Sequence, residues 1–213
     1  MDAQLLTRRP HRPREALTLF GEVALPLARA HEICGPARGF LAMLVAGALE
    51  GPVFWIAPAW QADAPNPEAM AALAQPGRFH FVSARRAEDV LWALEEVLRS
   101  GAVPLAVADL TGLRGLPGMT AVRRLHLAAE TGAAEGAHAP LGLLLTPGTG
   151  GAPGIETRWH IAQAHQPGMP GWRLTRARAR TAPPRAWALT GRPGAWVLAP
   201  EADKDRSPRL APS

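Results

Sequence analysis

Residues 79–109, FHFVSARRAEDVLWALEEVLRSGAVPLAVAD, decide the fold class. Two short apolar runs, 79–82 and 105–109, flank a segment in which apolar residues recur with helical spacing. The apolar positions of that segment are Val90, Leu91, Leu94, Val97 and Leu98. We expect Ser83 to cap this helix and Gly101 to end it. A strand, a helix and a strand in this order predict a right-handed βαβ unit, and therefore a parallel sheet.

The same alternation continues on both sides of this unit. Further strands are predicted at 31–34, 53–57 and 141–145, and helices at 40–50, after Asn66 and after Thr120, whose side chains can act as N-caps. After residue 146 no long helical pattern remains. Short strand patterns separated by Gly and Pro turns follow at 158–161, 172–180, 187–189 and 195–198. The predicted fold is α/β, a mostly parallel β-sheet flanked by helices with a C-terminal antiparallel strand extension.

Length and charge suggest how the chain is organised. Its 213 residues fit one large domain with tails, and we expect a basic flexible arm at 1–16, a single domain at 17–199 and a disordered tail at 200–213. The formal charge is +5, and Lys204 is the only lysine among 23 basic residues. This arginine bias has two interpretations: the codon usage of a GC-rich genome, or a need for bidentate contacts to phosphate.

The single cysteine, Cys34, limits the chemistry that the chain can perform. It allows no intramolecular disulfide and no multi-cysteine metal site, and we expect a cytoplasmic protein. We interpret Cys34 as a small buried residue rather than a nucleophile, and the scattered histidines as ordinary hydrogen-bonded residues. The longest apolar run, 40–49, is shorter than the roughly 20 residues that span a membrane. No apolar segment follows the basic N-terminus, so no secretory signal is expected.

The turn after the first predicted strand lies where α/β proteins bind ligands. It reads EICGPARGFL over residues 32–41. Its Gly-Pro pair, together with the helix end and strand at 99–109, resembles the phosphate-loop region and Walker B passage of RecA-like proteins. Over about residues 20–199 the chain is similar to the ImuA-type accessory proteins of translesion synthesis, a RecA-like family related to SulA. That similarity lies in residues 30–32, 85–89, 92–96, 123–130 and 191–198.

The turn departs from a nucleotide-binding loop. A Walker A loop reads Gly-x-x-x-x-Gly-Lys-Ser/Thr, in which the lysine reaches the phosphates and the hydroxyl binds Mg²⁺. Here the two glycines are one residue too close, and apolar residues stand at the lysine and hydroxyl positions. Asp109 keeps the Walker B position, where we favour a structural role at the strand end. The degenerate loop therefore comprises Gly35, Pro36, Gly39, Phe40, Leu41 and Asp109, and the sequence predicts no ATPase activity, no cofactor and no metal.

The resemblance implies a function that the residues alone do not. ImuA-type proteins act in SOS-induced error-prone translesion synthesis with an ImuB-like protein and an error-prone polymerase III alpha-type subunit. A non-catalytic adaptor is therefore expected, with a dimer or hetero-complex left open and no filament. Two alternatives remain: a DNA-stimulated ATPase with an atypical loop, and a SulA-like inhibitor of cell division.

The C-terminal strands carry an excess of positive charge. Residues 157–200 contain no Asp or Glu, and alternate positions in a strand lie about 6.6 Å apart on one face. This spacing predicts that Arg176, Arg178 and Arg180 share a face. Three interpretations remain open: a track for single-stranded DNA, a surface for an acidic protein partner, and a solvated edge that discourages aggregation. The candidate residues are Arg173, Arg176, Arg178, Arg180, Arg185 and Arg192.

Overall fold

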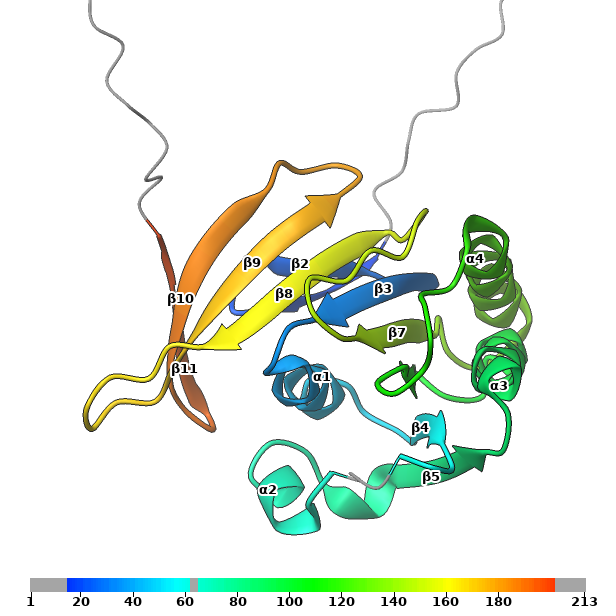
Figure 1. Ribbon diagram of the computed structural model, residues 1–213, viewed down its shortest axis with the longest axis horizontal. Helices are drawn as coiled ribbons and strands as arrows, with labels where there is room; N and C mark the ends of the chain where they lie inside the picture. Colours follow the sequence, from blue (N-terminus) through cyan, green and yellow to red (C-terminus); the bar gives the residue numbers. More distant parts are fainter. Residues whose placement is uncertain (1–14, 62–64, 202–213) are drawn as a thin grey trace, which may run out of the picture.

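A nine-stranded sheet forms the centre of the molecule (Figure 1). The computed structural model describes residues 15–61 and 65–201. The sheet order is β11-β10-β9-β8-β3-β7-β6-β4-β5. The bounds of these strands are β3 (Arg29–Cys34), β4 (Val53–Pro58), β5 (Phe79–Ala84), β6 (Leu105–Asp109), β7 (Leu141–Thr146), β8 (Thr157–Gln163), β9 (Gly171–Ala179), β10 (Arg185–Arg192) and β11 (Ala195–Pro200). A separate antiparallel hairpin pairs β1 (Ala16–Leu19) with β2 (Val23–Pro26).

Helices cover both faces of this sheet. The bounds are α1 (Arg38–Gly47), α2 (Pro67–Ala71), α3 (Ala87–Ser100) and α4 (Met119–Glu135), with a 3-10 turn η1 (Pro76–Arg78). Buried side chains of α1 and the β1–β2 hairpin pack on one face, together with Trp159 and Trp187. Helices α3 and α4 lie side by side on the other face (Figure 1). The α/β prediction is confirmed.

The sheet changes direction one strand later than the sequence suggests. Strands β5, β4, β6, β7, β3 and β8 all run parallel, and the antiparallel extension begins with β9. The prediction that 158–161 belongs to the antiparallel part is therefore wrong. Residues 147–156 carry the chain across β3 without a helix, so that β8 pairs with β3 in parallel.

The helix ends confirm two of the four predictions about caps. The Asn66 side chain accepts a hydrogen bond from the Glu68 amide, and Gly101 ends α3 in the left-handed conformation. Ser83 does not cap α3, because β5 continues to Ala84 and α3 begins three residues later. Thr120 lies inside α4, whose N-cap is Gly118.

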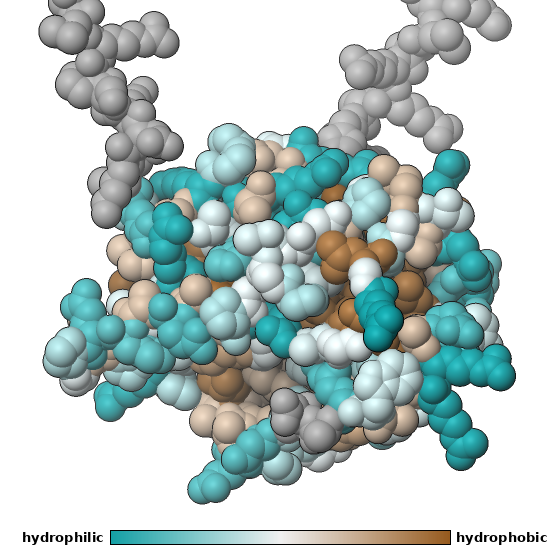
Figure 2. Space-filling model, viewed as in Figure 1, coloured by the Kyte–Doolittle hydropathy of each residue, from teal (hydrophilic) through white to brown (hydrophobic). Residues whose placement is uncertain are grey.

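Strands include one residue that the sequence assigns to the arm and one that it assigns to the tail. Ala16 pairs with Pro26 in the β1–β2 hairpin, and β11 continues to Pro200. Residues 1–14 and 202–213 lie outside the described residues. None of the described helices is both long and apolar enough to cross a membrane. Hydrophilic side chains cover much of the face shown in Figure 2, and its hydrophobic residues form small separate groups.

Candidate functional site

The turn between β3 and α1 is a short connection held against β8. Only three residues, 35–37, separate the strand from the helix. Gly35 has φ +93, and a Cβ at this position would lie 2.4 Å from the Ile161 carbonyl oxygen. That same oxygen accepts a hydrogen bond of 3.2 Å from the Ala37 amide. Glycine is therefore required by the close approach of β8, and one amide of the turn is already occupied by the sheet.

Arg38 and Asp109 join the turn to the loop after β6. The Arg38 guanidinium donates to Thr111 Oγ1 at 2.7 and 3.1 Å and to the Gly35 carbonyl at 3.1 Å. The Asp109 carboxylate accepts from the Thr111 amide at 3.0 Å and from Gln61 Nε2 at 2.8 Å. Asp109 thus orders the end of β6, which agrees with the structural role favoured for it from the sequence.

The two apolar residues of the loop pack into the protein. The Phe40 ring stacks on Trp172 with 4.1 Å between centroids and an interplanar angle of 9°. It also meets Trp196 edge to face at 5.6 Å. Leu41 is buried in the core on the α1 side of the sheet. The positions of a Walker lysine and hydroxyl are therefore occupied by packing contacts.

A cavity of about 430 Å³ lies beside this turn, between α1 and α2. Its walls are mostly apolar, with side chains that include Phe40, Met43, Trp55 and Met70. The polar end holds Arg38 and Asp109, together with Gln61 and Thr111. The Gln61 side-chain oxygen is buried there and has no hydrogen-bond partner among the residues that the structure describes. Nothing in the sequence singles out Arg38 or Gln61, because Arg38 is an isolated polar residue before the predicted helix and Gln61 is one after the predicted strand at 53–57.

Glu32 is a fully buried carboxylate at the centre of a second polar cluster. It accepts from Thr146 Oγ1 at 2.8 Å and from the amides of Gly151 and Ala152 at 2.9 and 3.2 Å. The Arg158 guanidinium pairs with its other oxygen. This network fixes the loop that crosses β3 on its way to β8, so the role of Glu32 is structural.

The candidate arginines do not form one track. The register of β8 and β9 slips at Arg158 and Trp159, and Ala177 is the extra residue on β9. Cross-strand partners point to the same face, and Arg176 pairs with Trp159 whereas Arg178 pairs with Arg158. The two side chains therefore lie on opposite faces. The prediction that they share a face with Arg180 is wrong, because simple alternation does not anticipate a bulge.

Acidic residues from outside the acid-free stretch neutralise part of this charge. Arg173 pairs with Glu201 at 2.7 Å, Arg185 with Glu22 at 2.9 Å, and Arg180 with Glu156 at 3.3 Å. Arg176 lies over the rings of Trp159 and Trp187, at 5.9 and 5.2 Å from their centroids. Arg178 and Arg192 are the two candidates that are exposed and have no ion pair within residues 15–61 and 65–201.

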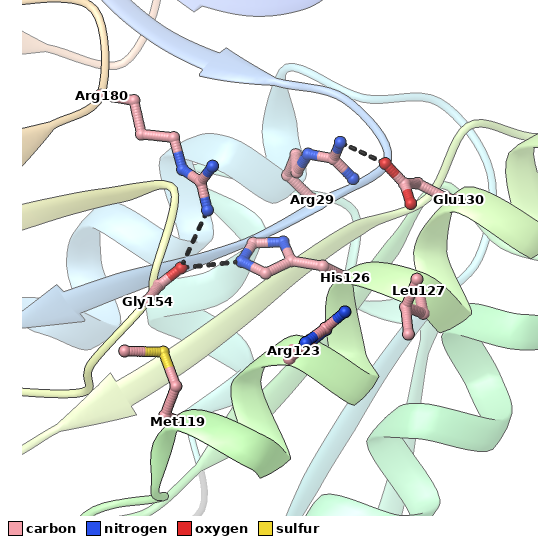
Figure 3. Close-up of a pocket in the computed structure, with 8 residues that line it drawn as sticks. All are labelled: Arg29, Met119, Arg123, His126, Leu127, Glu130, Gly154 and Arg180. Carbon is pink, nitrogen blue, oxygen red and sulfur yellow. Dashed lines mark hydrogen bonds and ion pairs between the residues drawn. The ribbon is translucent and has the colours of Figure 1, made fainter.

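Arg180 reaches a pocket of about 250 Å³ beside α4 (Figure 3). His126 Nδ1 accepts from the Ala30 amide at 3.3 Å, so Nε2 carries the hydrogen and donates to the Gly154 carbonyl at 3.1 Å. Arg180 donates to the same oxygen at 3.4 Å, and Arg29 pairs with Glu130 (Figure 3). Burial lowers the pKa of His126, which keeps the ring neutral. The pocket combines three arginines with a neutral imidazole, both of whose ring nitrogens are hydrogen-bonded within the protein.

The structure also places the one candidate nucleophile, Cys34, and the side chains that could hold a metal ion. Cys34 is buried, its thiol donates to the Trp159 carbonyl at 3.5 Å, and burial raises its pKa to about 12. Within the part of the chain that the structure describes, no three His, Cys, Asp or Glu side chains are placed to hold a metal ion.

No protein-family model matches the chain, and no curated protein matches it significantly.

Proposed function

We propose that this protein is a non-catalytic RecA-like adaptor in error-prone translesion DNA synthesis. Its expected partners are an ImuB-like protein and an error-prone polymerase III alpha-type subunit, as the family resemblance implies. The chain would act as a binding platform and not as a nucleotide switch. Its recruitment would then be constitutive and set by the amount of protein in the cell.

The observation that carries this proposal is that side chains and hydrogen bonds of the domain itself fill the turn between β3 and α1. A phosphate loop needs free amides that converge on the anion, a lysine and a hydroxyl. Here the Ala37 amide bonds to Ile161, Phe40 stacks on Trp172, and Leu41 is buried. These contacts are part of the packing of the domain, so a nucleotide would have to displace them. This supports the adaptor over the alternative of an ATPase with an atypical loop.

Equilibrium binding of a fluorescent ATP analogue tests the loss of nucleotide binding. We expect no saturable, Mg²⁺-dependent signal at micromolar protein, with a functional RecA-like ATPase as the positive control. Micromolar Mg²⁺-dependent binding would favour the ATPase alternative.

Co-purification from DNA-damaged cells tests the adaptor itself. The tagged chain should retain the ImuB-like protein and the polymerase subunit in the absence of added nucleotide. Arg178→Ala, which removes an exposed cation without a described ion pair, should be compared with Arg173→Ala, whose partner is Glu201. Failure to retain either protein would contradict the adaptor function. Inhibition of FtsZ assembly by the purified chain would contradict it too and would favour the SulA-like alternative.

A further inference from the structure

β11 lies at one margin of the nine-stranded sheet, where β10 is its only neighbour among the described strands (Figure 1). Its six residues, AWVLAP, carry no charge. Edge strands of natural proteins usually carry charges, bulges or prolines that prevent pairing with another strand. In β11 only the terminal Pro200 is of this kind, and the Val197 side chain is 59% exposed.

The main chain of β11 presents two hydrogen-bonding residues to the outside. The Glu201 amide donates to the Ala186 carbonyl at 3.0 Å, in line with the register of β10 and β11. Hydrogen-bonded pairs alternate along an antiparallel ladder, so Val197 and Ala199 bond to β10. The amides and carbonyls of Trp196 and Leu198 therefore point away from the sheet. No described residue outside β11 forms a hydrogen bond with them.

We propose that a second copy of this chain pairs with this edge, through an antiparallel contact of the two β11 strands about a two-fold axis at Val197. In this register Trp196 of each copy faces Leu198 of the other. Each such pair can exchange two N–H···O bonds, because the main-chain amides and carbonyls of both residues point away from β10. The two sheets would then be continuous across the dimer. This proposal is independent of the adaptor function.

Self-complementarity favours a second copy over another partner. A two-fold axis places the same residue opposite itself, and Val197 would meet its equivalent in a non-hydrogen-bonded pair with Cα atoms about 4.5 Å apart. This covers an apolar side chain that is otherwise exposed. At each end of the contact, Arg192 at the end of β10 in one copy and Glu201 after β11 in the other stand on the same face of the sheets, with Glu201 also paired with Arg173 of its own copy. Charges of opposite sign therefore flank the contact on both sides.

Sedimentation velocity of the full chain, at concentrations up to about 100 µM, measures this association directly. We expect a reversible equilibrium between monomer and dimer. Val197→Lys places two like charges opposite each other at the axis, and it should raise the dimer dissociation constant at least tenfold. Ala199→Lys is the matched control, since it adds the same charge on the same exposed face, where it would oppose Ala195 of the second copy. It should change the constant less than threefold.

A second variant tests the main-chain contact. Leu198→Pro removes an amide that points away from β10, so it should weaken the dimer and leave the β10–β11 hairpin paired, as judged by circular dichroism and thermal unfolding. The proposal is overturned if the wild-type chain stays monomeric at all concentrations, or if the two lysine variants associate equally. Growth beyond a dimer would also overturn it, because pairing of β11 with the opposite edge strand, β5, is heterologous and does not close.

Discussion

The rings of Phe40 and Trp172 are stacked at 4.1 Å, and this contact joins the first turn of α1 to β9. It links the parallel part of the sheet to its antiparallel extension. Phe40→Ala removes the stack and part of the apolar packing around it, and should lower the free energy of unfolding by about 2 kcal/mol. Urea denaturation measures this loss. Phe81→Ala, at a phenylalanine that is 51% exposed, should cost less than about 1 kcal/mol.

Restoring the missing Walker residues should not restore nucleotide binding. The double variant Phe40→Lys, Leu41→Thr supplies the lysine and hydroxyl, but the turn still has three residues and its Ala37 amide still bonds to Ile161. We expect no Mg²⁺-dependent binding of a fluorescent ATP analogue. Thermal unfolding should show a large loss of stability, because Leu41 is buried and the Phe40 ring loses its contacts with Trp172 and Trp196. Binding at micromolar concentration would show that only two side chains stand between this turn and a functional loop.

The strand-helix alternation could be predicted because each element carries its own hydrophobic period. Val90, Leu94 and Leu98 are buried as the helical spacing predicts, and the β6 strand is buried on both faces. The direction of β8 could not be predicted, because it depends on a crossing loop that Glu32 holds from a distant strand. The arginine faces could not be predicted either, since a one-residue bulge at Ala177 reverses the alternation.

The degenerate loop shows the same division between local pattern and tertiary contact. The absence of lysine and hydroxyl is visible in the sequence. The bond from Ala37 to Ile161 and the stacking of Phe40 on Trp172 join residues more than a hundred positions apart. No local pattern carries such contacts. The ion pair between Arg185 and Glu22 could not be predicted for a related reason, because the two residues are distant in sequence.

Cys34 should be chemically inert in the folded protein. The thiolate is the reactive form, and burial raises the pKa of this thiol to about 12. The native chain should therefore not react with a disulfide reagent such as DTNB at pH 8 within the time in which a free thiol reacts completely. The same sample in guanidinium chloride should release one equivalent of chromophore. Rapid reaction of the native chain would show that the loop around Cys34 opens.

Glu32 should contribute far more to stability than the exposed carboxylates. Glu32→Gln leaves Arg158 partly buried without its counter-charge, and should lower the free energy of unfolding by about 3 kcal/mol. Glu201→Gln breaks the exposed pair with Arg173 and should cost less than about 1 kcal/mol. In the double variant Glu32→Gln, Arg158→Met the unpaired cation is removed, so part of the loss should be recovered. Equal losses in the two single variants would contradict the central role of the Glu32 network.

The stability of the fold should fall as the pH drops below about 6.5. His31 is fully buried between the Pro26 carbonyl at 2.9 Å and Thr157 Oγ1 at 2.7 Å. Burial lowers its pKa to about 3. Between the two pKa values the unfolded chain binds a proton that the folded chain excludes, so stability decreases by about 1.4 kcal/mol per pH unit. Above pH 6.5 both states are neutral at this residue, and the contribution is constant.

Denaturation by urea between pH 7.5 and about pH 5 measures this slope, in a range above the usual carboxyl pKa values. His31→Asn should be less stable than the wild type at pH 7.5, because it loses part of the buried packing. Its stability should fall less steeply with decreasing pH. The slope that remains is assigned to His126, whose pKa is also lowered by burial, and it should decrease further in the variant that also carries His126→Asn. Identical slopes in wild type and His31→Asn would show that His31 takes up its proton without unfolding.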